Sequence, residues 1–445
     1  MKRVMWVAVI ALATTLTAAI AAAQQFDPKV YQQMVDASSP QTIPPGTRIT
    51  LHNWKSYSNF FPYFVRLAFE GNSHFHVLDS PEYVVEVGPT GDYPIPKAMR
   101  QDTEKYAGQT RLVPYPATGG FIYTGYQAGT PFPNPTEPNK AAKIMYNLWM
   151  GFFQPFVLHE FSHNWLTDSF GNVQPEDTDD AFYRLMHMSD PPYPMNLPDA
   201  AGYIVANRFI EMIPEQAKYT TALELIPEDP TRLTEEYAFL PSLRRSLRLS
   251  SASRCAPILG TDFLADDSDW KPAFFRPEYL GEKKLLVPFI DEKVAFTEGA
   301  RSAFMGGDKN TGVAFPGWPK AGYTKWQVRK VYLINMRATE ALGRGYCYSD
   351  RIFSVDTQTW QTYTEENYDR TEKLYHVVWD YPGTVMYEGH RTVQPRAFGG
   401  AMGYDWENNH ATASYGYDLT IDDQVPGEYR APGVYTPSGL DRVMK

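Results

Sequence analysis

The chain has 445 residues, and its 51 acidic and 41 basic side chains give it a formal net charge of −10 at pH 7. Such an acidic chain lacks the basic surface that binding to nucleic-acid phosphates requires, so a nucleic-acid partner is excluded. Aromatic residues make up 15% of the sequence and prolines number 36, which is typical of many short strands joined by rigid turns.

Residues 1–23 predict a secretory signal peptide. Lys2 and Arg3 form its basic start, Val4 to Ile20 its apolar core, and Ala21 to Ala23 its small-residue cleavage site. Cleavage removes two of the 41 basic residues and leaves 39 against 51 acidic ones, a net charge of −12. An uncleaved membrane anchor is the alternative, because about 20 apolar residues can span a bilayer. We expect export from the cytoplasm.

The rest of the chain is expected to form an extended N-terminal arm, residues 24–48, and a single large β-rich domain, residues 49–445. The arm is rich in proline, glutamine and serine, and it is expected to lie on the domain without joining its core. Early in the domain, His74 and His76 flank Phe75 in the alternation of an edge strand with outward polar side chains.

Two helices are predicted within the domain. The spacing of Phe60, Phe64 and Ala68 predicts a short helix near its start. Apolar residues recur at helical spacing over residues 139–152, and Pro155 follows as a stop signal. The second helix is therefore amphipathic.

Most of the remaining pattern predicts β-strands. Short β-branched and aromatic runs alternate with turn residues, and three consecutive runs form an antiparallel meander. Consecutive antiparallel strands form a curved sheet, whose inner face can hold an apolar ligand. The expected strands cover residues 208–213, 222–226, 237–240, 328–338, 351–355, 360–368 and 373–380.

The run His159-Glu160-Phe161-Ser162-His163 fits the HExxH pattern of zinc peptidases. On a helix the two histidines would share a Zn²⁺ ion, but on a strand they lie about 13 Å apart at about 3.3 Å per residue. Pro155 before the run and turn residues 168–172 after it favour a strand. No metal site is predicted; a zinc peptidase with His159 and His163 as ligands remains the alternative.

The acidic run that follows, Pro175 to Asp180, is interpreted as a solvated loop, so Glu176 is not expected to be a third zinc ligand. The two cysteines, Cys255 and Cys347, are both predicted on β-structure. In an oxidising compartment they can form a disulfide, and two buried thiols are the other possibility.

A longer pattern occurs at residues 236–248. An aromatic strand end, a Leu-Pro corner and three arginines precede Gly260-Thr261-Asp262-Phe263. This pattern resembles Lol-type periplasmic carriers, which sort outer-membrane lipoproteins, and more closely the Gram-negative family catalogued as domain of unknown function 1329. Further segments that resemble that family are Val87–Thr90, Thr103–Ala107, Gly129–Pro133, Lys143–Asn147, Asp350–Asp356 and Glu366–Asp369.

The resemblance implies a fold that is mainly β with a few helices. Its core would be an open, strongly curved antiparallel β-barrel of the Lol-carrier type with an N-terminal elaboration. The implied location is the periplasm, free or at the outer membrane. The implied partners are an inner-membrane transporter of the resistance-nodulation-division kind or an outer-membrane protein.

These observations favour a non-enzymatic protein without a cofactor that binds or escorts a hydrophobic or lipid-like molecule. Arg244, Arg245 and Arg248 are expected to contact a lipid headgroup or an acidic partner, unless they pair with acidic loops of the chain itself. A secreted zinc peptidase and a structural adaptor at the outer membrane, its barrel filled by its own side chains, are the alternatives. The expected ligand contacts are Tyr332, Ile334, Trp360, Thr362, Tyr363, Leu374 and His376.

Overall fold

The computed structural model describes most of the domain. Its described residues are 26–37, 42–70, 84–151, 155–170, 172–189, 192–249, 254–258, 260–268, 270–291, 319, 322, 324–343, 345–393 and 400–440. The predicted signal peptide and the pair His74 and His76 lie outside these residues. Within them, no helix has the length and apolar character needed to cross a membrane.

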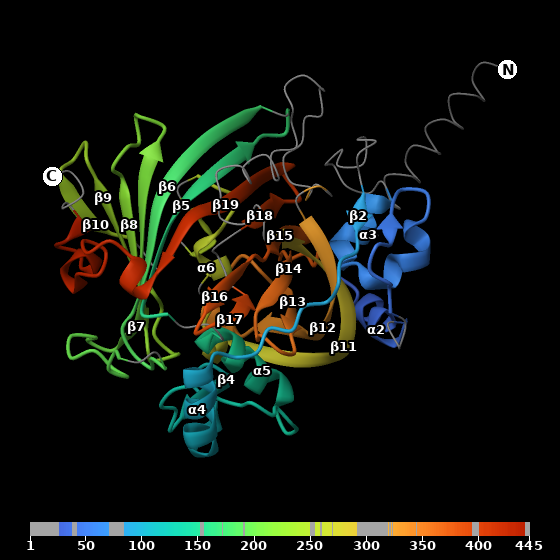
Figure 1. Cartoon of the computed structure of the whole chain (residues 1–445), viewed down its shortest axis with the longest axis horizontal. Helices are drawn as coiled ribbons and strands as arrows, with labels where there is room; N and C mark the ends of the chain where they lie inside the picture. The colour runs from blue at the N-terminus through green and yellow to red at the C-terminus, as the bar shows by residue number, and fades with distance from the viewer. Residues whose placement is uncertain are drawn as a thin grey trace.

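A single antiparallel sheet of 13 strands dominates the fold (Figure 1). The order across the sheet is β10-β9-β8-β7-β6-β5-β19-β18-β15-β14-β13-β12-β11, so the last long strand, β19, is inserted between β5 and β18. The strands are β5 (Val157–Thr167), β6 (Val173–Arg184), β7 (Tyr203–Ile213), β8 (Thr221–Pro227), β9 (Glu235–Leu240), β10 (Arg245–Arg248), β11 (Phe275–Ile290), β12 (Thr324–Ala338), β13 (Asp350–Asp356), β14 (Thr362–Tyr368), β15 (Leu374–Tyr381), β18 (Gly400–Asp405) and β19 (His410–Ile421).

The sheet is open and curved. Strands β10 and β11 form its two edges and do not pair with each other, and the sheet bends around helix α6 (Ala265–Ser268), as Figure 1 shows. The predicted fold class, mainly β with a few helices around an open, curved antiparallel sheet, is therefore confirmed. The strands predicted from β-branched and aromatic runs are also confirmed, as is the amphipathic helix, here α5 (Lys140–Met150).

The smaller elements lie around this sheet. The two-stranded pairs are β1 (Arg48–Ile49) with β2 (Val85–Glu86), β3 (Arg111–Tyr115) with β4 (Gly120–Thr124), and β16 (Thr384–Tyr387) with β17 (His390–Val393). The remaining helical segments are α2 (Pro28–Ala37), η1 (Trp54–Phe60), α3 (Tyr63–Phe69), α4 (Lys97–Tyr106), η2 (Ala107–Gln109), η4 (Pro272–Phe274), η6 (Glu340–Leu342), η7 (Asp422–Gln424) and η8 (Pro432–Tyr435).

The prediction of an extended N-terminal arm is wrong for the part that the structure describes. Residues 28–37 form the helix α2, and its Tyr31 and Met34 are only 1% and 2% exposed. The Tyr31 hydroxyl donates a hydrogen bond of 2.5 Å to Glu366 Oε2 on β14. On a helix, residues three positions apart lie on the same face, so Tyr31 and Met34 both pack into the domain core. The segment is therefore part of the domain.

The two faces of the sheet have different coverings. On the outer face, α3 packs through Phe64 against Trp379 of β15, with ring centroids 5.1 Å apart. The C-terminal residues 425–440 cover β6 to β9 on the same side, where Val434 and Tyr435 join a buried cluster with Leu223. On the inner face lie α5 and the segment that contains α6, and between them and the sheet there is a cavity.

Candidate functional site

The cavity has a volume of about 300 Å³. Its floor is the inner face of the sheet, and its roof consists of the C-terminal end of α5 and residues 254–258, 260–268 and 270, which we call the cover segment. Apolar walls come from Leu148, Trp149, Met150, Phe182, Phe209, Ile226, Ile258, Phe263, Leu264, Trp270, Trp360 and Val378.

Small side chains in register across five strands make room for the cavity. Glu176 of β6 is paired with Asn164 of β5, Asn164 with Ser414 of β19, Ser414 with Ala401 of β18, and Ala401 with Asp380 of β15. All five residues line the cavity. Directly paired residues of antiparallel strands project from the same face of a sheet. The short side chains of Asn164, Ser414 and Ala401 therefore leave space above the sheet between the carboxyl groups of Glu176 and Asp380.

The acidic run 175–180 belongs to β6, so its interpretation as a solvated loop is wrong. Side chains alternate along a strand. Glu176 and Asp180 therefore face the cavity, whereas Asp177 and Asp179 face outward, where each contacts a histidine of β5. A run of acidic residues is normally solvated. In this strand the outward carboxyl groups contact histidines of β5, and the inward ones line the cavity.

Burial changes the acidity of this wall. Burial raises the pKa of Glu176 to about 7, and it raises the pKa of Asp180 to about 7 against the opposing effect of hydrogen bonds from Ser162 and Thr178. Burial, reinforced by repulsion from Glu176, Asp180 and Asp177, raises the pKa of Glu211 on β7 to about 8. These carboxyl groups therefore exchange protons near neutral pH.

One arginine also lines the cavity. Arg184 lies at the end of β6, and its Nε and Nη2 donate hydrogen bonds to the carbonyl oxygens of Met186 and Met150 at 3.0 and 3.4 Å. Burial lowers the pKa of Arg184. The guanidinium group connects β6 to the end of α5 and so helps to close this end of the cavity.

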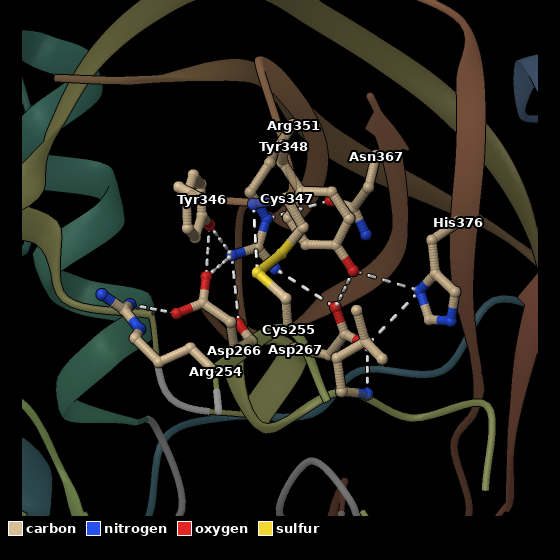
Figure 2. Close-up of a disulfide and its surroundings, with 11 residues drawn as sticks. Arg254, Cys255, Asp266, Asp267, Tyr346, Cys347, Tyr348, Arg351, Asn367 and His376 are labelled. Atoms are coloured by element: carbon tan, nitrogen blue, oxygen red, sulfur yellow. Dashed lines mark hydrogen bonds and ion pairs between the residues drawn. A yellow bond between two sulfur atoms is a disulfide. The ribbon is translucent and has the colours of Figure 1, made fainter. Parts of the chain in front are cut away.

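The cover segment is held to the sheet by a disulfide between Cys255 and Cys347, whose Cα atoms are 5.7 Å apart (Figure 2). The pairing that the sequence left open is therefore made. The prediction that both cysteines lie on β-structure is wrong: Cys255 is in a short helical turn and Cys347 in the bend before β13. In strands, both backbones would be held by the hydrogen bonds of the sheet. The turns allow the two segments to approach each other.

Buried ion pairs surround the disulfide, as Figure 2 shows for Asp266 and Arg351. Arg351 of β13 donates to Asp266 Oδ2 at 2.9 Å and to Glu365 Oε2 of β14 at 2.7 Å. Arg254 also pairs with Asp266, and the Tyr348 hydroxyl donates to Asp267 at 2.9 Å. Burial lowers the pKa of Arg351, but the surrounding tyrosine and carboxylate groups outweigh this effect and raise it well above its usual value.

The cover segment also contacts the strands beside the floor. The backbone N–H of Asp262 donates to Thr412 Oγ1 of β19 at 2.8 Å, and Thr412 donates in turn to Asp262 Oδ2 at 2.9 Å. A Cβ atom at Gly403 of β18 would lie 2.5 Å from the Asp262 carbonyl oxygen. Glycine at position 403 is therefore required for the cover to lie this close to the sheet.

The structure separates the predicted ligand contacts. Trp360 lines the cavity, and Tyr332 stacks on it with ring centroids 6.1 Å apart. His376 contacts the cover, with Nδ1 3.3 Å from Asp267 Oδ2, and Tyr363 donates to Asp356 Oδ2 at 3.1 Å. None of the other predicted contacts belongs to the cavity wall: Tyr332, Ile334, Thr362, Tyr363, Leu374 and His376.

The predicted arginine cluster lies at the β10 edge of the sheet. Arg244 is in the turn between β9 and β10, and Arg245 and Arg248 are on the edge strand β10, at the left of Figure 1. All three are exposed, and Arg248 lies 3.3 Å from Glu235 Oε2. The cavity wall contains none of them.

The HExxH run lies on β5, so the predicted strand is confirmed and the helix on which the zinc interpretation depends is not formed. His159 Nε2 lies 3.0 Å from Asp179 Oδ1, and His163 Nδ1 lies 2.6 Å from Asp177 Oδ1. Both histidines are buried. No group of three or more His, Cys, Asp or Glu side chains within the described ranges is arranged to hold a metal ion.

Sequence reasoning did not identify Glu176, Asp180 and Arg184 as residues that line a cavity. Residues 176–180 show no alternation of apolar and polar side chains, because Asp177 and Asp179 on the outward face are as polar as Glu176 and Asp180. The local pattern therefore gave no strand signal there.

Comparisons with known proteins identify a family. Residues 73–419 match the family model described as "Protein of unknown function (DUF1329)". No curated protein was found to match the chain.

Three solved structures are similar to this chain. One is a DUF1329 family protein from Desulfovibrio piger ATCC 29098, with 11% identity, a TM-score of 0.47, and coverage of 68% of this chain and 100% of that one. A domain from Vibrio parahaemolyticus, described as outer membrane lipoprotein-sorting, has 12% identity, a TM-score of 0.46, and coverage of 68% and 99%. A LolA superfamily protein from Nitrosomonas europaea has 11% identity, a TM-score of 0.38, and coverage of 66% and 97%.

Proposed function

Since the chain belongs to the DUF1329 family, described as of unknown function, we propose from its cavity that it binds a hydrophobic or lipid-like small molecule and escorts it through the periplasm. The observation that carries this proposal is the roofed cavity of about 300 Å³ between the sheet and the cover segment. Pockets that bind small molecules have volumes of roughly 300–1,000 Å³, mostly apolar walls and a few polar groups.

The walls supply the affinity. Trp149, Trp270 and Trp360 line the cavity together with phenylalanine and aliphatic side chains. Covering apolar surface stabilises a complex by about 25 cal/mol per Å², before the cost of immobilising the ligand. An apolar body can therefore pack between the small side chains of the floor and these aromatic rings.

The disulfide supports the proposed location. Disulfides persist in oxidising compartments such as the periplasm and are rare in the cytosol. Cys255 and Cys347 are the only two cysteines of the chain, and they form this disulfide. Together with the predicted signal peptide, this favours a periplasmic protein, and fractionation that recovers the chain in the cytoplasm would contradict it.

The test is extraction of the purified protein followed by mass spectrometry, with Ser414→Trp to block the cavity. Ser414 lines the floor and is half-buried, so a bulky ring there fills space that the ligand would occupy. Ser242→Trp, at an exposed position in the turn between β9 and β10, is the matched control. We expect a stoichiometric apolar molecule from the native chain and the control, and none from Ser414→Trp. Equal recovery from both variants, or no molecule from the native chain, contradicts the proposal.

The exposed arginines remain a proposed contact for a headgroup or an acidic partner, such as a resistance-nodulation-division transporter or an outer-membrane protein. Leu243 and Leu249 flank them and are also exposed. Binding to vesicles of anionic and of zwitterionic lipid distinguishes a lipid headgroup from a protein partner. If the contact is a headgroup, the native chain should bind anionic vesicles, and charge reversal at Arg244 and Arg245 should abolish that binding. No binding to either vesicle excludes the headgroup.

A further inference from the structure

Glu211 presents a buried carboxyl group to the cavity. Its side chain is 2% exposed, it lines the cavity, and neither of its carboxylate oxygens accepts a hydrogen bond from any residue that the structure describes. Burying a polar group without a hydrogen-bond partner is costly, and burying an unpaired charge is more so. The carboxyl group of Glu211 is therefore an acceptor that a bound molecule can satisfy.

Two further acceptors lie beside it. Glu211 is paired in register with Thr178 of β6, and Glu176 and Asp180 stand two positions away on either side of Thr178. Diagonal neighbours in an antiparallel pair have Cα atoms about 7–8 Å apart. Glu176 Oε2 and Asp180 Oδ1 are buried and accept no hydrogen bond from the described residues. We call Glu176, Asp180 and Glu211 the acidic wall.

The rest of the cavity does not neutralise this wall. Among the described residues that line the cavity, the acidic side chains are Glu176, Asp180, Glu211, Glu224, Asp267 and Asp380, and the basic one is Arg184. Arg184 donates to two backbone carbonyl groups and stands four positions from Asp180, about 13 Å at about 3.3 Å per residue. It is too far away to pair with Glu211.

Other cations lie outside the wall. Arg254 pairs with Asp266 in the cover segment, and Lys271 lies 5.1 Å from the ring centre of Trp149 on the roof. No histidine lines the cavity within the described ranges. The charged groups of β6 that flank the partner of Glu211 in register are therefore both acidic, Glu176 and Asp180, whereas Glu224 of β8 is paired with Asn207, four positions from Glu211.

We propose that the bound molecule is an amphiphile with a primary ammonium group, which donates to Glu211, Glu176 and Asp180 while its apolar body occupies the aromatic part of the cavity. An ammonium group has three N–H donors and no acceptor, which matches three acceptors on adjacent strands. This inference rests on the proposed function, because it assigns a chemical class to the molecule that the cavity binds.

The proposal has a consequence for pH dependence. Burial raises the pKa of all three carboxyl groups, so the free protein holds protons on the acidic wall near neutral pH. A bound cation favours the ionised carboxylates, so binding releases protons and strengthens as the pH rises from 6 to 8. A neutral ligand of the same length gains nothing from this ionisation.

The test is isothermal titration calorimetry of the purified full-length mature protein with decylammonium, decanol and decanoate at pH 8. These probes share one apolar chain and differ only in the head group. We expect decylammonium to bind at least tenfold more tightly than decanol, and decanoate to bind most weakly. Equal or tighter binding of decanol or decanoate overturns the ammonium assignment and leaves the proposed function standing, whereas binding of none of the three contradicts the proposed function itself.

Two further measurements check the role of the acidic wall. Glu211→Gln should weaken decylammonium binding at least tenfold and leave decanol binding unchanged, while Glu215→Gln, at a position whose side chain is 83% exposed, should change neither. In the unaltered protein, which avoids any question of folding, decylammonium affinity should rise about tenfold from pH 6 to pH 8. A flat pH profile for decylammonium overturns the inference.

Discussion

Arg351 of β13 donates a hydrogen bond of 2.9 Å to Asp266 of α6, and both side chains are completely buried. Arg351 also donates to Glu365 of β14 at 2.7 Å. One guanidinium group thus links the cover segment to two neighbouring strands of the sheet. The roof of the cavity is held by a buried charge network as well as by a covalent bond.

Arg351→Met should lower the free energy of unfolding by about 3–5 kcal/mol, because it removes the buried guanidinium group that donates to both Asp266 and Glu365, and Asp266 then keeps only its ion pair with Arg254. Arg337→Gln is the matched control, since Arg337 pairs with Asp350 at 3.2 Å in a largely exposed position. Exposed ion pairs contribute about 0–1 kcal/mol. Urea denaturation of both variants measures the difference; similar losses would argue against the network.

Loss of the disulfide should destabilise the chain and loosen the roof. The disulfide spans a sequence separation of 92 residues, and in the chain-entropy model a loop of this length contributes about 4–5 kcal/mol. The double variant Cys255→Ser, Cys347→Ser, compared with the oxidised native protein by urea denaturation, tests this value. A thiol assay on the unfolded, unreduced protein should find no free thiol, and two free thiols would contradict the pairing.

Stability should fall as the pH rises through neutrality, because the acidic wall binds protons more tightly in the folded state than in the unfolded one. The pKa of Glu211 is about 8 in the folded protein against 4.5, so folding favours the protonated carboxyl group. The resulting stabilisation is present below pH 4.5 and is lost as the pH rises toward 8. Glu211→Gln should therefore raise the unfolding free energy by roughly 1–3 kcal/mol at pH 8 and little at pH 5.

Denaturation curves at pH 5 and pH 8 without ligand provide the measurement for Glu211→Gln. Glu215→Gln serves again as the control, because its exposed side chain should show no such pH dependence. A gain that is equal at both pH values would mean that the amide packs better, and that ionisation of Glu211 is not the cause.

Zinc should not bind stoichiometrically at the HExxH run. His159 and His163 lie four positions apart on a strand, about 13 Å, and each contacts an aspartate of β6. After dialysis, metal analysis should find far less than one zinc per chain, and added zinc should leave the melting temperature unchanged. Retained zinc that is lost in His159→Ala would restore the peptidase alternative.

Local patterns in the sequence predicted much of the fold. Runs of apolar, β-branched and aromatic residues bounded by turn residues located strands such as β12 and the meander β13 to β15, and helical spacing located α5. The turn residues that follow the HExxH strand correctly predicted its antiparallel pairing with the next strand, β6. These features depend on residues a few positions apart, so the sequence alone contains the information.

The candidate site was decided by contacts between distant segments. Trp360 was the predicted ligand contact that lines the cavity, whereas Thr362, two positions further, does not. The acidic run resembled a loop because its outward partners, His159 and His163, are recognised only once β5 and β6 are in register. The resemblance of the arginine run to a known family identified the family correctly, but not the position of those arginines relative to the cavity.

The pairing of Cys255 with Cys347 and the pairing of Asp266 with Arg351 join residues more than 80 positions apart. The sequence by itself determined which strands and helices form, because hydrophobic periodicity and turn chemistry act locally. Only the tertiary structure decided which carboxyl groups are buried, what neutralises them and where space remains, because burial and electrostatic pairing depend on the packing of all segments together.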